Sequence, residues 1–183
     1  MNAKVLYIVG TQRGGTTITG RVAGALPGFV YSGELRRLWA RAGDADVRCG
    51  CGEVHAQCPV WSRVLPETLV GLAPAEVRAW QRVAAPDRGS ARKLGWLLAG
   101  RGGEADAQFA AVTGRLYRAF ATASGAHVVI DASKTPADAF VAARSGVDTY
   151  VLHLVRDPRG VAYSVARRAG AGAASATRAA VGA

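Results

Sequence analysis

Short apolar runs, separated by segments of helical periodicity, mark the first and last thirds of the chain. The runs cover residues 5–9, 29–31, 127–130 and 150–155, and each ends at glycine or polar residues. Runs of this length between such residues are typical of buried strands. Because strands that alternate with helices form parallel sheets, the pattern predicts an α/β fold.

Helical patterns follow the runs. Ile18, Val22 and Leu26 recur every four residues, which places them on one face of a helix that the next Pro-Gly pair ends. Another helix is expected after Thr135, a capping residue that precedes a proline. Pro158 likewise suits the first turn of a helix. The strands should therefore be joined by helices.

The middle of the chain, residues 61–124, is mostly helical in pattern. Proline and glycine break it at 86–89 and at 100–103. Its clearest helix spans about 105–122 and places four apolar residues on one side. We expect these to be core residues: Phe109, Val112, Leu116 and Phe120.

Polar side chains recur where the predicted strands end. Glu34 follows the second strand, Lys134 the third and Arg156 the fourth. Parallel strands end at the same edge of a sheet, where α/β proteins bind ligands. These residues are therefore expected to converge on one site.

The first strand runs into a glycine-rich turn, Gly10–Thr17, with the sequence Gly-Thr-Gln-Arg-Gly-Gly-Thr-Thr. Backbone N–H groups of such a turn, and the helix that follows it, bind an anion. Thr16 occupies the position where an ATP-hydrolysing loop has lysine, and Arg13 supplies a cation three residues earlier. The turn therefore suits a phosphate but not ordinary triphosphate chemistry.

Composition favours a small anionic ligand. The 183 residues, about one domain, include 23 Lys and Arg against 13 Asp and Glu, a formal net charge of +10. Most of these cations are arginines, which suit phosphate and sulfate, and their scattered positions disfavour nucleic acid. No membrane-spanning run and no signal peptide is present, so we expect a cytoplasmic protein. The oligomeric state is not predicted.

All three cysteines lie in a loop-like segment over 39–61. Cys49, Cys51 and Cys58 could bind zinc together with His55. One residue between the first two cysteines is tighter than the usual zinc-finger spacing. We therefore favour a structural loop with reduced thiols over zinc, and a stable disulfide is not expected in cytoplasm.

Two separated motifs resemble those of sulfotransferases that use 3′-phosphoadenosine 5′-phosphosulfate (PAPS), of the bacterial carbohydrate or small-molecule type. The turn Gly10–Thr17 resembles the family's 5′-phosphosulfate loop, where Lys or Arg precedes a small-Gly-Thr-Thr run. The segment from Leu154 to Ser164 resembles the 3′-phosphate segment. The resemblance implies a P-loop-type three-layer fold over 1–168, with a parallel sheet and a largely helical insertion at 61–124.

The resemblance also implies roles on the donor side. Arg13 would neutralise charge on the leaving phosphate oxygen, and Arg156 and Ser164 would bind the 3′-phosphate. The 5′-phosphate would be held by Gly14, Gly15, Thr16 and Thr17. PAPS would be the donor co-substrate, and no metal ion is obligatory, because a sulfuryl group carries less charge than a phosphoryl group.

On the acceptor side, Glu34 matches a catalytic glutamate, and Lys134 a lysine near the donor sulfate. The alternative for Glu34 is an ion pair with Arg36 or Arg37, and for Lys134 a surface position. The acceptor would be a hydroxyl or amine of a glycan or small molecule.

Length is the main departure from that family. Sulfotransferases of this type continue further, whereas this chain passes into an Ala/Gly-rich segment, 169–183, that we expect to be disordered or weakly helical. The alternative function is therefore an inactive, truncated nucleotide-binding remnant or interaction module. A P-loop kinase is the third hypothesis, which the missing lysine disfavours.

Overall fold

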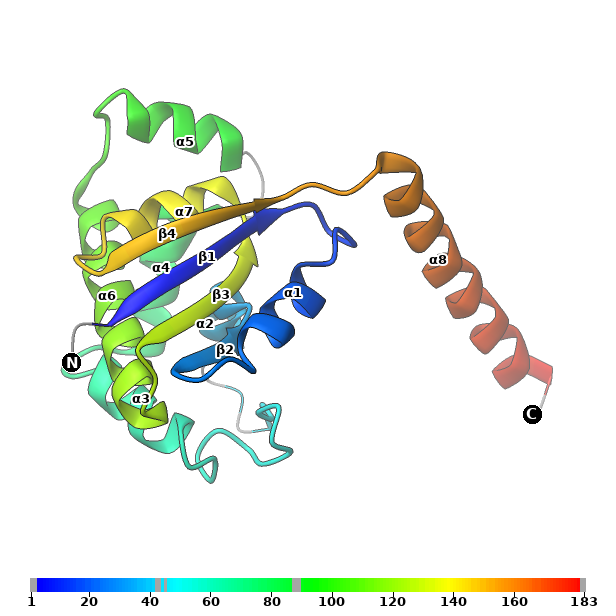
Figure 1. Cartoon of the computed structure of the whole chain (residues 1–183), viewed down its shortest axis with the longest axis horizontal. Helices are drawn as coiled ribbons and strands as arrows, with labels where there is room; N and C mark the ends of the chain where they lie inside the picture. The colour runs from blue at the N-terminus through cyan, green and yellow to red at the C-terminus, as the bar shows by residue number, and fades with distance from the viewer. Residues whose placement is uncertain (1–2, 42–43, 45, 87–89, 182–183) are drawn as a thin grey trace.

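A parallel four-stranded sheet forms the centre of the molecule (Figure 1). The computed structural model describes residues 3–41, 44, 46–86 and 90–181, with side chains for all of these except 90, 91 and 171–181. The strands, in the spatial order β2-β3-β1-β4, are β1 (Lys4–Gly10), β2 (Phe29–Gly33), β3 (Val128–Lys134) and β4 (Asp148–Leu154). The predicted α/β fold with a parallel sheet is confirmed.

Helices fill the connections between strands. Their bounds are α1 (Thr16–Ala23), α2 (Leu38–Arg41), α3 (Trp61–Thr68), α4 (Pro74–Ala84), α5 (Ser90–Leu98), α6 (Glu104–Ser124), α7 (Pro136–Ala143) and α8 (Pro158–Val181), with a 3-10 turn, η1, at Leu35–Arg37. The break predicted at 100–103 is confirmed. Of the break predicted at 86–89, residues 87–89 lie outside the described part.

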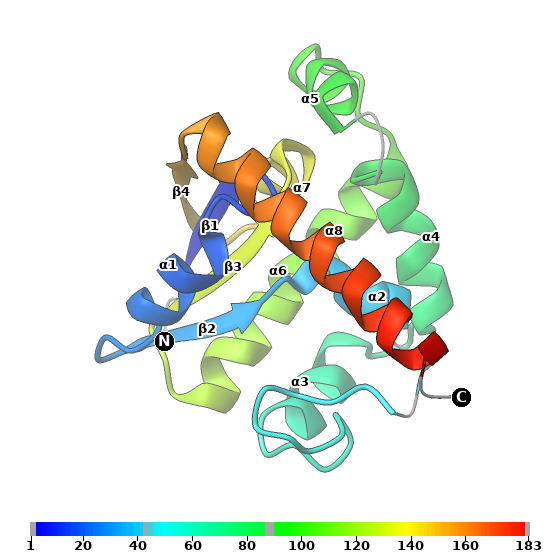
Figure 2. The ribbon, with the colours of Figure 1, turned by 90° about the vertical axis from the view of Figure 1, so that its right-hand side faces the viewer.

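Helices lie on both faces of the sheet. Figures 1 and 2 show α1 on one face and α6 and α7 on the other. Side chains alternate along β1, so Val5 and Tyr7 join the larger core with α6 and α7, whereas Ile8 joins a small cluster on the α1 face. The larger core therefore lies on one side of the sheet.

Helix α6 is the main element of that core. As predicted, its apolar positions are buried: Phe109, Val112, Leu116 and Phe120. The ring of Trp61, at the start of α3, meets Phe120 edge-on with centroids 5.1 Å apart. Helices α3 and α4 of the insertion thus pack on α6, its last helix, and share the larger core, whereas α5 contacts α7.

The apolar face of α1 does not pack on the sheet. Ile18 and Val22 are 71% and 67% exposed. Glycines of this segment approach the sheet closely instead. A Cβ on Gly24 would lie only 2.7 Å from the Cβ of Tyr31 in β2. Periodicity located the helix, which ends at Ala23 and not at the predicted Leu26, and small residues decide which side meets the sheet.

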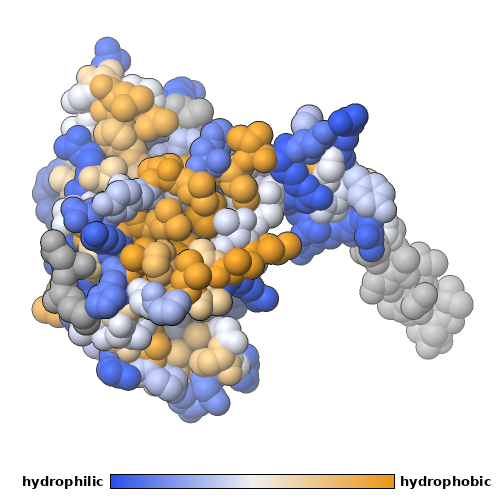
Figure 3. All heavy atoms as spheres, viewed as in Figure 1, coloured by the Kyte–Doolittle hydropathy of each residue, from blue (hydrophilic) through white to orange (hydrophobic). Residues whose placement is uncertain are grey.

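Strand β4 is a sheet edge with exposed apolar side chains. Tyr150 and Val151 are both more than half exposed, and Figure 3 shows apolar atoms at the surface over the sheet. Beyond β4, α8 leads away from the sheet (Figure 1) and continues as helix to Val181. None of the described helices is long and apolar enough to cross a lipid bilayer.

Candidate anion-binding site

The glycine-rich turn after β1 has the backbone of an anion cradle. Arg13 and Gly15 adopt left-handed conformations, with φ of 64° and 99°, on either side of Gly14. The Gly14 N–H donates to the carbonyl of Thr11 at 3.0 Å, which closes the turn. Left-handed residues are typical of anion-binding turns. The N–H of Gly14 is used inside this turn, so the N–H groups available to an anion are those at the start of α1. Since glycine has no side chain, the N-cap Gly15 does not cover these N–H groups.

One pocket brings the strand ends together. It has a volume of about 440 Å³ and opens at the carboxyl edge of the sheet. Except for Gly14, all predicted site residues line it: Arg13, Gly15, Thr16, Thr17, Glu34, Lys134, Arg156 and Ser164. The structure thus brings together, at the strand ends, the residues that were expected to converge.

Arg13 joins the glycine-rich turn to the segment after β4. Arg156 donates from Nη1 to the backbone oxygen of Arg13 at 2.8 Å. Arg13 in turn donates from Nε to Ser164 Oγ at 2.9 Å. Two motifs more than a hundred residues apart in sequence are therefore in direct contact. This contact places the side chains of Arg13, Arg156 and Ser164 beside the glycine-rich turn.

Glu34 lies between two cations on the opposite wall. Its Oε1 accepts a hydrogen bond from Lys134 Nζ, and its Oε2 one from Arg37 Nε at 2.8 Å. The ion pair with a neighbouring arginine, which was the alternative to a catalytic role for Glu34, is thus present. The side chains of Glu34 and Lys134 are 25% and 15% exposed, against 72% for Arg37. Arg37 is therefore the partner that an incoming ligand would displace more readily.

A second, smaller pocket adjoins the first. Its volume is about 250 Å³. Glu34 and Lys134 line both pockets, together with Gln12 and Arg37. The second pocket adds polar groups from Ser133 and Thr135, and its wall is otherwise largely charged. The carboxylate of Glu34 and the amine of Lys134 therefore lie where ligands in the two pockets would meet.

A buried hydrogen-bond network supports this wall from behind. Asp131 accepts from the Tyr117 hydroxyl at 2.8 Å, from the Ser133 N–H at 2.9 Å and from the Ser133 hydroxyl. Ser133 Oγ also accepts from the backbone N–H of Arg36 at 3.0 Å. These bonds fix the segment after β2 to the end of β3. Asp131 and Ser133 shape the turn, and neither lines the larger pocket.

A second buried carboxylate completes the network. Asp138, on the first turn of α7, lies 3.0 Å from Arg36 Nε and accepts a hydrogen bond from the Thr135 hydroxyl. Burial raises the pKa of Asp138 to about 6, because loss of solvent outweighs the opposing effects of Arg36 and Thr135. Burial also raises the pKa of Asp131. Both groups therefore ionise less readily than exposed aspartates.

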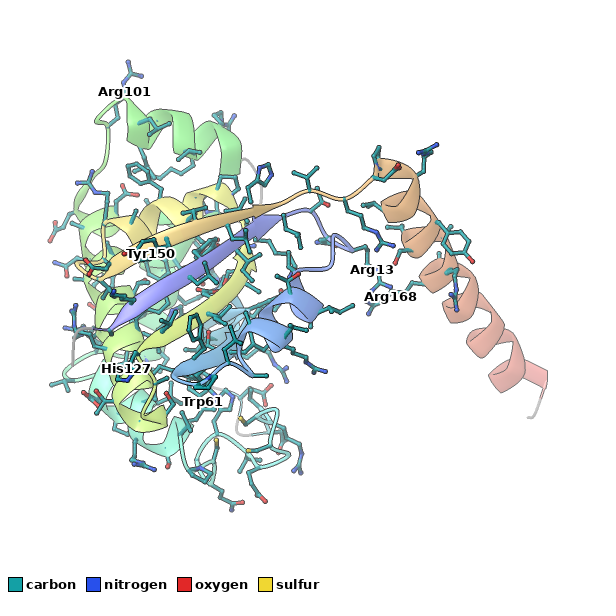
Figure 4. All side chains as sticks on the ribbon, viewed as in Figure 1. Arg13, Trp61, Arg101, His127, Tyr150 and Arg168 are labelled. Carbon is teal, nitrogen blue, oxygen red and sulfur yellow. The ribbon has the colours of Figure 1, made fainter. Side chains whose placement is uncertain are left out.

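Sequence patterns did not single out every lining residue. Arg168 lies in the pocket four residues after Ser164, on the same face of α8, and Figure 4 shows it close to Arg13. This i,i+4 spacing was the signal that could have identified it. Gln12 also lines the pocket but follows no pattern beyond its place in the turn.

The cysteine segment lies apart from this site, next to α3 (Figures 1 and 4). The Sγ atoms of Cys49, Cys51 and Cys58 all lie within 4.8 Å of one another. His55 stacks its ring on Trp61 instead, with centroids 4.8 Å apart. Desolvation raises the pKa of Cys49 to about 11. Sequence had placed the three thiols in one loop; the structure brings them into one cluster.

Comparison of the chain with family models, with curated proteins and with solved structures found no match. A function for the chain therefore has to be inferred from the geometry and chemistry of its own residues.

Proposed function

We propose that the chain is a P-loop-type sulfotransferase that moves a sulfuryl group from PAPS to a hydroxyl or amine of a carbohydrate or other small molecule. The observation that carries the proposal is the direct contact between the glycine-rich turn and the Arg156–Ser164 segment. A donor with phosphate groups at both the 5′ and 3′ positions needs two anion sites side by side. An ordinary ATP-binding loop needs only the first, together with a lysine that is replaced by Thr16 here.

The size and charge of the first pocket suit such a donor. Its volume of about 440 Å³ falls within the range of small-molecule sites, roughly 300–1,000 Å³. Arg13, Arg156 and Arg168 supply cations along one side, and the adjoining space of about 460 Å³ is lined by Arg167 as well. Guanidinium groups bind phosphate with two parallel hydrogen bonds, which suits a doubly phosphorylated nucleotide.

On the donor side, the residues of the chain bind the PAPS nucleotide and orient it. Backbone N–H groups from Gly15 to Thr17, with the hydroxyls of Thr16 and Thr17, hold the 5′-phosphate, and Arg156 and Ser164 hold the 3′-phosphate. Arg13 stands beside both and offsets the negative charge that builds on the leaving oxygen. Preorganised donors act most strongly on such developing charge, at roughly 3 kcal/mol for each. PAPS supplies the activated sulfuryl group. The acceptor oxygen or nitrogen bonds to its sulfur as the bond from sulfur to the 5′-phosphate oxygen breaks and adenosine 3′,5′-diphosphate leaves, and no metal ion is obligatory for this step.

On the acceptor side, Glu34 accepts the proton. Its carboxylate lies on the wall shared by the two pockets, so a hydroxyl in the smaller pocket would approach it from the side opposite the donor. Lys134, which is bonded to the same carboxylate, orients Glu34 and faces the transferred group. The polar lining of the smaller pocket favours a polar acceptor over an apolar one.

Calorimetric titration tests the donor site first. The protein should bind adenosine 3′,5′-diphosphate without added metal, and at least tenfold more tightly than ADP, because the 3′-phosphate adds charge-assisted bonds. Equal affinity for the two diphosphates would contradict the proposal. Binding of ATP that depends on Mg²⁺ would instead favour a kinase.

Turnover of radiolabelled PAPS with a panel of glycan and small-molecule acceptors tests the chemistry. We expect transfer by the wild-type chain, and a loss of about 100-fold or more in Glu34→Gln with nucleotide affinity retained. Unchanged turnover in Glu34→Gln would remove Glu34 as the base. A folded protein that binds the diphosphate but transfers sulfate to nothing, water included, would be a non-catalytic nucleotide-binding remnant.

A further inference from the structure

We propose that Cys49, Cys51 and Cys58 bind one Zn²⁺ ion through three thiolates, and that the fourth coordination position is open to water. The cysteine cluster is separate from the anion-binding pocket, so this proposal can be tested independently of the proposed transferase activity. The thiols release their protons to solvent when the ion binds. Sequence spacing alone favoured reduced thiols without a metal, and the geometry favours the other alternative.

Distances between the sulfur atoms are close to those of a zinc site. Cys51 Sγ and Cys58 Sγ lie 3.7 Å apart, and all three sulfurs lie within 4.8 Å of one another. Tetrahedral zinc with bonds of about 2.3 Å to sulfur holds its ligands about 3.8 Å apart. One pair already has this separation, and the widest needs to close by at most about 1 Å. Small side-chain rotations supply such a shift.

Backbone hydrogen bonds hold the first two cysteines in a tight turn over residues 49–53, called the knuckle below. The Gly52 N–H donates to the carbonyl of Cys49 at 2.9 Å, and Gly52 has a φ of 96°, which glycine adopts without strain. The Cys49 N–H donates to the carbonyl of Glu53 at 2.8 Å, next to an antiparallel bridge between Arg48 and Val54. The one-residue spacing that disfavoured a zinc finger is therefore compatible with two sulfurs on one side of a turn.

The third cysteine approaches from the beginning of α3. Cys58 is buried, and its carbonyl accepts the N–H of Ser62 at 3.0 Å in the first turn of that helix. A helix N-terminus favours a thiolate, because its positive end offsets the negative charge. The guanidinium of Arg48, which donates to the carbonyl of Gly52 at 2.8 Å, adds a cation near the knuckle. These groups suit the net negative charge of a zinc ion bound to three thiolates.

The segment also lacks a core of its own. Between residues 46 and 60, Val47 and Cys58 are the buried side chains among those described. A loop of this length with little regular structure loses considerable conformational entropy on folding. A metal ion that joins the two ends of this loop would stabilise its folded conformation, as in other small metal-bound loops. The three clustered thiols are the groups available for that purpose.

The ion would be zinc with three protein ligands. Thiolates are soft ligands that suit zinc, whereas magnesium and calcium prefer oxygen. His55 is held on Trp61 and is not part of the cluster, and among the residues that the structure describes no other His, Cys, Asp or Glu atom joins it. Cys51 is exposed, so the fourth position faces solvent.

Metal binding by the full chain tests the proposal. The protein is purified with a reductant, stripped with a chelator and titrated with ZnCl₂ in competition with a chromophoric chelator. We expect about one Zn²⁺ per chain, and a thiolate-to-metal absorption band in the near ultraviolet when CoCl₂ replaces zinc. Cys51→Ser should weaken zinc binding by at least about 100-fold, since loss of even an outer-shell partner costs tenfold to 100-fold. Because Cys51 is exposed, this variant should fold.

His55→Phe is the matched control. It keeps an aromatic ring on Trp61 but removes the imidazole nitrogens, so zinc affinity should change by less than about threefold. A loss comparable with that of Cys51→Ser would overturn the three-thiolate site. Equal metal content in wild type and Cys51→Ser would overturn the metal site altogether.

A third measurement uses only the wild-type chain. Iodoacetamide is added to the reduced protein with and without ZnCl₂, and the alkylated cysteines are identified by mass spectrometry. We expect zinc to slow the alkylation of all three cysteines at least tenfold. Equal alkylation rates, or a Cys51–Cys58 disulfide in protein kept under reductant, would contradict zinc binding.

Discussion

Arg156 acts at two points of the candidate site. Its guanidinium holds the carbonyl of Arg13, whose backbone is in a left-handed conformation, and it lines the pocket as well. One side chain therefore supports the shape of the glycine-rich turn and supplies charge for a ligand. Under the proposed function, its substitution should weaken binding of the 3′-phosphate more than binding of the 5′-phosphate, because the backbone N–H groups after the turn are retained.

Arg156→Ala should weaken binding of adenosine 3′,5′-diphosphate by about tenfold to 100-fold, the value of one charge-assisted pair, and should abolish the preference over ADP. Calorimetry with both nucleotides measures this. The control is Arg159→Ala, which removes an exposed arginine three residues away that pairs with Asp157 and does not line the pocket. Equal effects of the two substitutions would show that only net charge matters.

Asp138 should make stability depend on pH. An aspartate in an unfolded chain titrates near about pH 3.9, whereas the folded-state pKa of Asp138 is about 6. The folded protein keeps this proton where the unfolded chain has lost it, so stability present below about pH 4 is lost as the pH rises through 6. A shift of two units corresponds to at most about 3 kcal/mol.

Asp138→Asn should remove that contribution. Urea unfolding near pH 4 and near pH 7 should show that the wild type loses about 2–3 kcal/mol more than the variant over this interval. Asp131 also has a raised pKa, but it is present in both proteins, and Arg36 and Thr135 keep their places around the site. Parallel pH profiles for the two proteins would rule out Asp138 as the cause.

At the scale of elements, helix α6 depends on a close contact at Gly114. A Cβ there would overlap the carbonyl oxygen of Ser145, in the turn between α7 and β4. Gly114→Ala should therefore destabilise the protein by about 1–3 kcal/mol, although alanine is the better helix former by about 1 kcal/mol.

Gly95, in α5, provides the comparison. A Cβ at this position meets nothing within 4 Å, so Gly95→Ala should leave stability unchanged or raise it by up to about 1 kcal/mol. Denaturant unfolding of both variants separates packing from helix propensity. A neutral Gly114→Ala would mean that α6 can move away from the turn at little cost.

Elements were predictable where local rules act alone. Thr135 caps α7 as expected, with the Asp138 N–H bonded to its hydroxyl at 3.2 Å. The exposed face of α1 was not predictable from Ile18 and Val22, because packing at Gly20 and Gly24 depends on where Tyr31 lies. Periodicity gives the presence of a helix, whereas its orientation depends on contacts with residues distant in sequence.

At the scale of the molecule, the candidate site could be predicted because parallel strands end at one edge. Glu34, Lys134 and Arg156 converge for this topological reason. The buried network behind them could not be predicted, because hydrogen bonds such as that from Tyr117 to Asp131 depend on how α6 packs. The cysteine cluster is a similar case, since spacing limits which residues can meet but does not place their side chains.

Lys134 carries a consequence for the balance between folding and activity. Its backbone is left-handed, with a φ of 75°, which costs a residue with a side chain roughly 1–2 kcal/mol. Glycine relieves that cost, so Lys134→Gly should be more stable than Lys134→Ala by about 1 kcal/mol, a reversal of the usual order. Chemical denaturation of the pair measures the difference, and an alanine variant of equal or greater stability would refute it. Both variants lack the amine that lines the pocket, so under the proposed function neither should transfer sulfate well. A chain selected only for stability would favour glycine at this position, so under the proposed function Lys134 exchanges stability for an amine at the pocket.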